Sequence, residues 1–209
     1  MKTNAFNQFA VEYDLWFDTH KFAYQSEAEA VRRFIPLDGK GIEIGAGTGR
    51  FSIPFEIKIG VEPSEEMAAI ARSRGITIHN SKAESLPFPD EHFDFALFVT
   101  TLCFVDNPSL ALQEAYRILK PQGKIIIGII DRESDLGKKY ESMKDKNKFY
   151  KSAKFYSTKD VIKILEETNF HQIKICQTIF SNPDEMKAKD TIKDGFGKGA
   201  FVVLSANKQ

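Results

Sequence analysis

One stretch decides how this chain folds: Gly41-Ile42-Glu43-Ile44-Gly45-Ala46-Gly47-Thr48-Gly49-Arg50-Phe51. A short apolar run, interrupted by Glu43, leads into glycines at alternate positions. This pattern predicts a buried strand that turns sharply into a helix, with bare backbone facing a ligand. The dinucleotide fingerprint G-x-G-x-x-G would need its third glycine where Arg50 stands. The stretch therefore predicts a nucleotide-like ligand without identifying it.

Strand-like and helix-like segments alternate on both sides of this stretch. Apolar and β-branched runs predict strands at 41–44, 57–61, 76–79, 93–99, 124–130, 173–180 and 200–204. Periodic and capping patterns predict helices at 3–20, 22–34, 64–74, 107–119 and 157–168, with another inside 131–154. We therefore expect a Rossmann-like, doubly wound α/β fold. Its mostly parallel seven-stranded sheet would have helices on both faces and an antiparallel last strand.

Length and composition favour one folded unit. With 209 residues, the chain can bury a substantial core without disulfide or metal support. We expect a single domain over 1–209, made of a helical lid (1–36), a ligand-binding core (37–130), a substrate-side insertion (131–155) and a C-terminal helix with two strands (156–209). The aromatic face of the first helix fits either plain packing on the domain or a lid over a ligand.

Charge and cysteine content narrow the class of protein. Lys+Arg and Asp+Glu both total 29, so zero net charge argues against nucleic-acid binding and against a polybasic membrane anchor. Cys103 and Cys176 lie in apolar runs and indicate free thiols in a reducing compartment, and no ligand set for a metal is visible. No apolar run approaches the roughly 18 residues of a membrane span. We expect a cytoplasmic location, and the oligomeric state is not predicted.

The carboxyl ends of the parallel strands should form one rim that binds the ligand. Glu62 ends the second predicted strand on this rim. A carboxylate there can accept both hydrogen bonds of a ribose diol, which would serve a nicotinamide cofactor or S-adenosylmethionine (SAM) equally. The alternative is a carboxylate that only favours the helix beginning after Ser64.

Several segments in order resemble the class I SAM-dependent methyltransferases, and among them the small-molecule branch that includes ubiquinone/menaquinone-type methyltransferases. The segments are Glu43–Gly49, Val61–Met67, Ala83–Phe88, Phe93-Asp94 and Leu119–Gly123. The resemblance covers roughly residues 40–130. It implies SAM as the cofactor and S-adenosylhomocysteine as the product.

The resemblance also implies roles for residues of the first two segments. Gly45, Ala46 and Gly47 would pass beside the methionine and ribose parts of SAM. Glu43 would support the amino group, directly or through water, and Glu62 would hold the ribose hydroxyls.

Further implied contacts involve the adenine and the sulfonium. Pro63 and Met67 would flank the adenine, the Ala83 backbone N–H would bind its ring, and the Thr100 backbone would lie near the sulfonium and amino groups. The family usually has an acidic residue where this chain has Lys82, so the adenine amine would meet either Glu84 or water.

Catalysis of methyl transfer requires mainly that the acceptor be held close and in line. A base is needed only if the acceptor must lose a proton, and the candidates are Tyr13, His20, Asp106 and Asp131. The histidine or aromatic residue that the family often has beyond the fourth strand is replaced here by Thr101–Phe104, where Cys103 is interpreted as packing.

The function expected from the sequence is methyl transfer from SAM to a small-molecule acceptor, with no nucleic-acid or membrane partner. Two alternatives stay open: a nicotinamide-dependent reductase that uses the same turn and Glu62, and a SAM-binding module without turnover.

Overall fold

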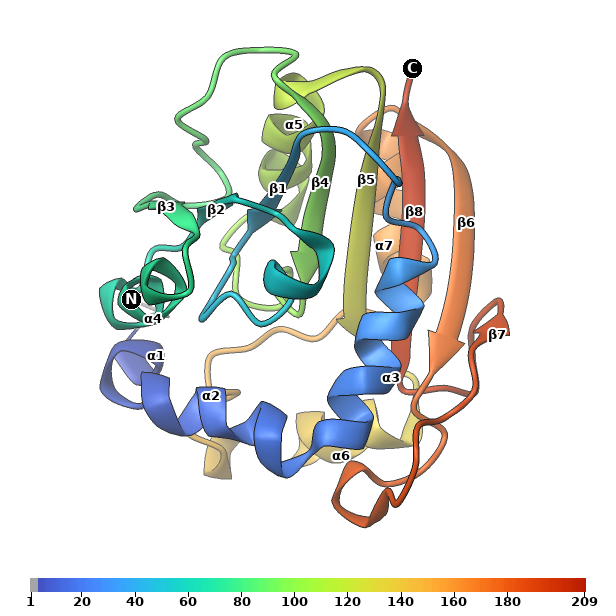
Figure 1. Cartoon of the computed structure of the whole chain (residues 1–209). Helices are drawn as coiled ribbons and strands as arrows, with labels where there is room; N and C mark the ends of the chain where they lie inside the picture. The colour runs from blue at the N-terminus through green and yellow to red at the C-terminus, as the bar shows by residue number, and fades with distance from the viewer. Residues whose placement is uncertain (1–3) are drawn as a thin grey trace.

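A single sheet of eight strands runs through the computed structural model, which describes residues 4–209. Its strands lie in the order β3-β2-β1-β4-β5-β8-β6-β7 (Figure 1). They are β1 (Gly41–Ile44), β2 (Ile59–Val61), β3 (Thr77–His79), β4 (Phe93–Val99), β5 (Leu119–Ile130), β6 (Phe170–Thr178), β7 (Lys193–Asp194) and β8 (Phe201–Lys208). β1 to β5 pair in parallel, and β8 lies antiparallel between β5 and β6. The predicted fold class is confirmed, with one strand more than the seven expected.

The additional strand is β7, which pairs two residues with the edge of β6. Two residues carry no alternating pattern, so local sequence could not reveal this strand. β5 also begins earlier than predicted, because Leu119 pairs with Phe93 before an irregular segment brings Lys124 opposite Phe95. The glycine-bearing segment after β7 leads directly into β8.

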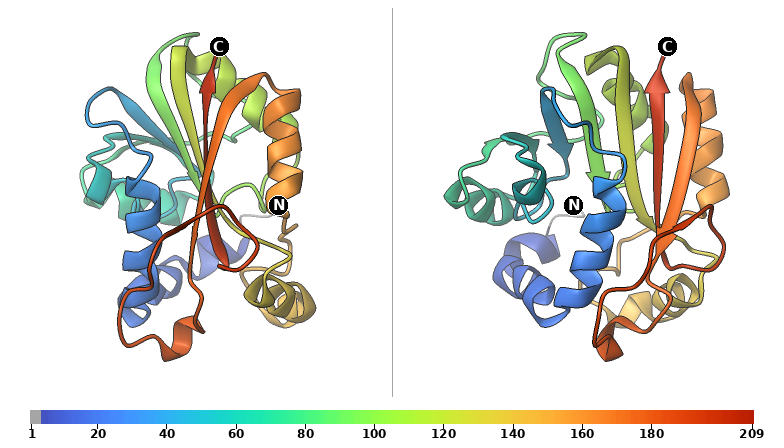
Figure 2. Two further views of the ribbon diagram at one scale, coloured as in Figure 1. Left: turned by 90° about the vertical axis from the view of Figure 1, so that its right-hand side faces the viewer. Right: turned by 45° about the vertical axis from the view of Figure 1, so that its right-hand side comes forward.

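Helices cover both faces of the sheet. They are α1 (Asn4–Gln8), α2 (Ala10–Thr19), α3 (Lys21–Arg32), α4 (Glu65–Ser73), α5 (Pro108–Ile118), α6 (Asp135–Met143) and α7 (Thr158–Glu167), with short 3₁₀ turns η1 (Ile53–Phe55), η2 (Lys144–Lys146) and η3 (Pro183–Glu185). α3 and α4 lie on one face and α5 and α7 on the other (Figure 2). α1, α2 and α6 lie beyond the carboxyl ends of the parallel strands (Figure 1). In the described part of the chain, no helix is both long and apolar enough to cross a membrane.

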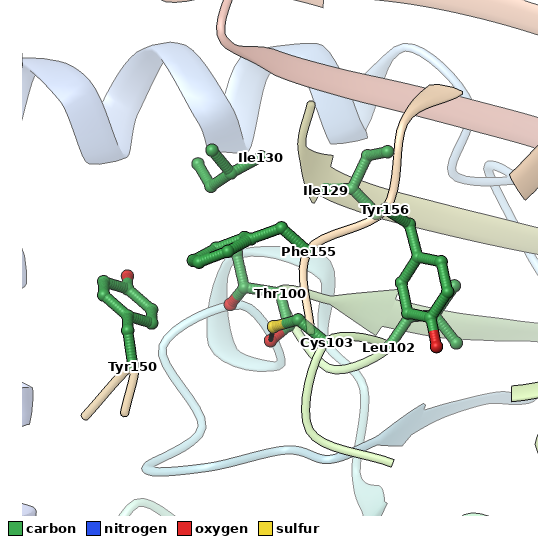
Figure 3. Close-up of a pocket in the computed structure, with 8 residues that line it drawn as sticks. All are labelled: Thr100, Leu102, Cys103, Ile129, Ile130, Tyr150, Phe155 and Tyr156. Carbon is green, nitrogen blue, oxygen red and sulfur yellow. Dashed lines mark hydrogen bonds between the residues drawn. The ribbon is translucent and has the colours of Figure 1, made fainter. Parts of the chain in front are cut away.

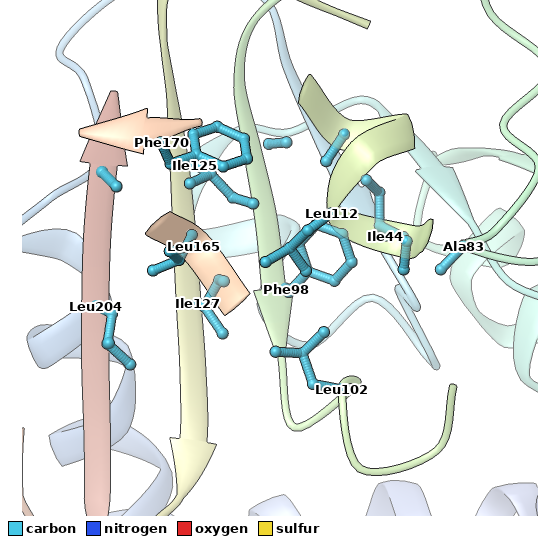
Figure 4. Close-up of a cluster of buried hydrophobic side chains, with 14 of the residues drawn as sticks. Ile44, Ala83, Phe98, Leu102, Leu112, Ile125, Ile127, Leu165, Phe170 and Leu204 are labelled. Atoms are coloured by element: carbon cyan, nitrogen blue, oxygen red, sulfur yellow. The ribbon is translucent and has the colours of Figure 1, made fainter. Parts of the chain in front are cut away.

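β4 is buried on both faces, as its continuous apolar run predicts. Phe98 packs with Leu112 of α5 in one core cluster (Figure 4), whereas Phe95 and Leu97 belong to the cluster beneath α3. This double burial fixes the strand ends that form the rim.

The predicted helix starts are confirmed by their caps. Asn107 accepts a hydrogen bond from the Leu110 N–H at 3.1 Å, and Ser157 forms a reciprocal capping box with Asp160. The single helix predicted over 3–20 is wrong, because Phe9 leaves helical geometry and separates α1 from α2. Its ring packs edge-on against Phe149, so tertiary packing replaces local propensity at this point.

Replacing Gly41 with alanine should destabilise the fold by about 1–2 kcal/mol, because the new methyl group overpacks the core. A Cβ there would lie 2.2 Å from the ring of Phe95, which crosses the glycine from the neighbouring strand. Urea unfolding measures the loss. Adding Phe95→Leu should cost less in the Gly41→Ala background than in the wild type. Strictly additive losses would contradict the steric explanation.

Candidate active site

The turn after β1 folds back on the neighbouring strand β2. The N–H groups of Gly45 and Ala46 both donate to the Val61 carbonyl, at 2.8 and 2.9 Å. Gly45 and Gly47 have φ values of +73° and +53°, in the left-handed region that glycine adopts without strain. A side chain at position 47 would meet only the Met67 methyl group, 3.8 Å away. The turn therefore leaves open space beside backbone, which fits a ligand such as SAM.

Glu62 joins this turn to the start of α4. One carboxylate oxygen accepts from the Gly47 N–H at 2.9 Å and the other from the Ser64 N–H at 2.8 Å. Burial raises the pKa of Glu62, and these two N–H groups counteract part of the rise. The carboxylate lies at the carboxyl end of β2, where the sequence predicts contact with a ribose.

Glu43 lies beneath the turn and is 2% exposed. Its carboxylate accepts a hydrogen bond from the Ser52 hydroxyl. Burial raises the pKa of Glu43 to about 8, with a further rise from nearby Glu62, although the Ser52 bond acts in the opposite direction. Its predicted contact with the cofactor amino group stays a prediction.

The residues predicted to surround the adenine lie along the same edge of the sheet. Pro63 precedes the Ser64 cap of α4, and Met67 is buried in the first turns of that helix. Ala83 is 7% exposed, and within residues 4–209 no group accepts a hydrogen bond from its backbone N–H. That N–H is therefore available to a ligand, and its contact with the adenine ring stays a prediction.

Glu84 has a contact that the sequence did not indicate. Its Oε1 atom accepts from the N–H groups of Asp106 and Asn107, at 2.6 and 3.1 Å, and so holds the segment that begins α5. Lys82 forms an exposed ion pair with Asp106 at 3.2 Å. These contacts favour solvent over Glu84 as the partner of the adenine amine, one of the two options left open above.

Thr100 ends β4 in an unusual conformation. Its φ of +50° is rare for a β-branched residue and marks local strain at the rim. Its N–H donates to the Gly128 carbonyl at 2.8 Å, and its side chain hydrogen-bonds Tyr13 of α2. Burial raises the pKa of Tyr13 well above its ordinary value, and the bond with Thr100 opposes that rise. The thiol of Cys103 donates to the Thr100 carbonyl, at 3.2 Å.

Asp14 fastens α2 to the glycine turn. Its carboxylate accepts paired hydrogen bonds from Arg50 and from Arg74, and another from the Thr48 hydroxyl. Burial alone would raise the pKa of Asp14, but the bonds from Arg74, Arg50 and Thr48 outweigh it and hold the pKa well below its usual range. Arg50, which excludes the dinucleotide fingerprint, thus links α2 to the glycine turn.

A cavity of about 360 Å³, named here the rim cavity, lies between α2 and the carboxyl ends of β4 and β5. It is lined by Glu12, Tyr13, Leu15, Trp16, Phe17, Thr19, Glu27, Phe51, Thr100, Ile130, Leu136, Tyr140, Asn147, Phe149, Tyr150 and Pro183. A pocket of about 10 Å³ adjoins it and shares Thr100, Ile130 and Tyr150 (Figure 3). The rim cavity has the volume of a small-molecule site.

The four candidate bases have different surroundings, and Asp106 is the exposed partner of Lys82 described above. Tyr13 lines the rim cavity. His20 is not among the lining residues: its Nε2 lies 3.0 Å from Asp184, and its ring stacks on Trp16. Asp131 is 2% exposed and accepts from the Glu133 N–H and the Thr158 hydroxyl, so its contacts organise the chain around α6 and α7. In residues 4–209, no group of His, Cys, Asp or Glu side chains is arranged to hold a metal ion.

Among the lining residues that sequence reasoning did not predict, Glu27 of α3 is a buried carboxylate. It lies on the buried side of the helix with Ala23, Ala30 and Val31, and is 6% exposed. These positions are spaced as one helical face, so a charged residue among them was a signal that could have been used.

Comparisons with known proteins agree with this geometry. A family model described as a methyltransferase domain matches residues 42–127. A crystal structure from Thermotoga maritima, of a SAM-dependent methyltransferase and possible histamine N-methyltransferase, has 52% identity and a TM-score of 0.97, covering 99% of this chain and 100% of that one. An uncharacterized protein of Methanocaldococcus jannaschii is 55% identical over 98% of this chain and 99% of its own. A ubiquinone/menaquinone biosynthesis C-methyltransferase of Rickettsia bellii is 30% identical over 59% of this chain and 58% of its own.

Proposed function

This chain belongs to the SAM-dependent methyltransferases, and we propose that it methylates a small molecule held in the rim cavity. The observation that carries the proposal is the position of that cavity. It is lined by residues of α2 and by Thr100, whose backbone is predicted to lie near the sulfonium and amino groups. A cavity of about 360 Å³ suits a small acceptor better than a nucleic acid or a folded protein. Membership in this family sets the nicotinamide alternative aside.

The residues of this chain would bind and orient both reactants. When bound, SAM supplies a methyl group already activated on its positively charged sulfur. Glu62 and the backbone of Gly45 and Gly47 would hold the cofactor, and Tyr13 with Thr100 would form the boundary between cofactor and acceptor. The lid would exclude water and fix the acceptor in line, which is the main contribution that this reaction needs.

The place of the chain within the family is a proposal too. The Rickettsia bellii relative supports the ubiquinone/menaquinone branch over little more than half of either chain. The Thermotoga maritima protein matches over its whole length, and it is described as a possible N-methyltransferase. Small amines are therefore the first acceptors to test, ahead of quinones.

Filling the rim cavity should abolish turnover while cofactor binding persists. We expect Leu136→Trp to lower methyl transfer at least about tenfold, because it displaces the acceptor from an aligned position. Leu136 lines the cavity from α6, and the exposed Leu110→Trp on α5 is the matched control. Transfer of labelled methyl from SAM to a panel of small molecules gives the rate, and calorimetry with S-adenosylhomocysteine gives cofactor affinity.

Each outcome of that experiment separates the possibilities. Unchanged transfer by Leu136→Trp would place the acceptor outside the rim cavity. Micromolar cofactor binding without transfer to any acceptor would favour a binding module without turnover.

A further inference from the structure

Glu27 combines burial with the absence of a partner. Its side chain is 6% exposed and lines the rim cavity from α3, and among the hydrogen bonds and ion pairs of residues 4–209 none involves its carboxylate. An unpaired buried carboxylate is costly, so native proteins rarely retain one without a use. Glu43 and Glu62 are also buried on this rim, but both have hydrogen-bond donors. A ligand that enters the cavity would therefore supply the hydrogen-bond donor that Glu27 lacks among the described residues.

The surroundings of Glu27 contain no protein cation. None of the side chains that line the rim cavity in the described part of the chain is Lys, Arg or His. Four tyrosine hydroxyls, those of Tyr13, Tyr24, Tyr140 and Tyr150, interact electrostatically with Glu27, which contributes to the raised pKa of each. An anionic ligand would therefore find no cation in the cavity to pair with, and it would be repelled wherever Glu27 is ionised.

The aromatic side chains that line the cavity also suit a cation. Trp16, Phe17 and Phe149 present aromatic rings together with the tyrosines. Aromatic faces attract cations through their quadrupole, and the attraction strengthens where water is excluded. Two carboxylates line the cavity, but Glu12 forms an ion pair with Lys148. The carboxylate of Glu27 inside an aromatic cavity is the chemistry that recognises an ammonium group.

We propose that Glu27 is the counter-ion for an ammonium group of the methyl acceptor, which makes the substrate class a small amine. This inference rests on the proposed function, and it assigns the group that selects the acceptor. Glu27 is a specificity-determining residue, and the nitrogen that it binds need not be the atom that receives the methyl group.

The burial of Glu27 predicts that binding of an ammonium ligand releases a proton, which can be measured. Burial raises the pKa of Glu27 to about 8, so the empty site holds a protonated carboxyl group at neutral pH. An ammonium ligand favours the ionised carboxylate, and its binding should therefore release about one proton. The four tyrosine hydroxyls stay protonated at this pH because burial raises their pKa values.

The test uses the full chain saturated with S-adenosylhomocysteine, so that no turnover occurs. Histamine and phenethylamine are each compared with the alcohol and the carboxylic acid of the same shape, by calorimetry in buffers of different ionisation enthalpy. We expect the amines to bind at least about tenfold more tightly than their partners, with proton release. Glu27→Gln should remove this preference and the proton release, while leaving unfolding temperature and S-adenosylhomocysteine affinity unchanged.

Glu29→Gln is the matched control, because Glu29 lies on the same helix but pairs with Lys189 at the surface. It should behave as the wild type. Binding of no amine, or equal binding of amine and alcohol, overturns the proposal while leaving methyl transfer to another acceptor intact. A loss of S-adenosylhomocysteine affinity in Glu27→Gln would also overturn it, because the occupant would then be the cofactor amino group. Failure of the wild type to bind S-adenosylhomocysteine would instead contradict the proposed function itself.

Discussion

Replacing Glu62 with alanine is expected to weaken SAM binding by about 2–3 kcal/mol, or roughly 30- to 150-fold in dissociation constant. Each carboxylate oxygen of Glu62 accepts one backbone N–H, from Gly47 or Ser64, and keeps a further lone pair. A ribose diol can donate to both oxygens at once, which makes the contact bidentate and charge-assisted. Calorimetric titration with SAM measures the loss.

The same substitution also removes two bonds that organise the glycine turn, so affinity alone is not decisive. Comparing two ligands in both the wild type and the variant separates the loss of the ribose contact from the disturbance of the turn. The wild type should prefer S-adenosylhomocysteine over its 2′,3′-dideoxy analogue, and Glu62→Ala should lose that preference. Glu65→Ala, at an exposed position of the first turn of α4 paired with Arg72, should keep it. An equal preference in the wild type and Glu62→Ala would show that the carboxylate does not hold the ribose.

The features that the sequence predicted correctly are formed by residues that lie close together in the chain. The cap of α5 at Asn107 and the capping box at Ser157 are each built within four consecutive residues. The glycine turn likewise follows from local backbone freedom, and the double burial of β4 from its own apolar run. The helix predicted after the glycine turn is wrong, because only the 3₁₀ turn η1 forms there, with Pro54 in it. Local rules of this kind established the fold class and the position of the cofactor turn.

The parts that the sequence did not reveal depend on residues far apart in the chain. His20 was a candidate base by residue type, yet Asp184 and Trp16 hold its ring. Asp131, another candidate base, likewise accepts a hydrogen bond from the Thr158 hydroxyl. Pairing across such separations is set by tertiary packing, and no spacing rule in a single sequence reports it.

The acceptor side of the site was harder to predict than the cofactor side for a physical reason. Backbone atoms at glycines form much of the predicted cofactor contact, and their sequence signature is compact. Side chains from the lid, from α6 and from the segment at 147–150 form the rim cavity. Glu27 becomes a buried carboxylate without a partner only when these segments enclose it. A carboxylate on the same helix in water would need no partner.

Replacing Asp14 with alanine is expected to destabilise the protein by about 3 kcal/mol, because it leaves two largely buried guanidinium groups without their shared partner. The side chains of Asp14, Arg50 and Arg74 are 14%, 18% and 26% exposed. Asp18→Ala is the matched control one helical turn away. Asp18 bonds Arg50 from the solvent side, at 60% exposure, and its removal should change the free energy of unfolding far less.

The pH dependence of stability tests the same ion pairs independently. The pKa of Asp14 is depressed in the folded state, so its contribution is fully present above the unfolded value of about 4 and is lost as the pH falls through the folded value. The difference in unfolding free energy between the wild type and Asp14→Ala should therefore be constant near neutrality and shrink in acid. Because α2 is held to the glycine turn by this carboxylate, Asp14→Ala should also release S-adenosylhomocysteine faster in stopped-flow experiments. A variant with wild-type stability and wild-type release would mean that the aromatic packing of α2 alone holds the lid over the cofactor.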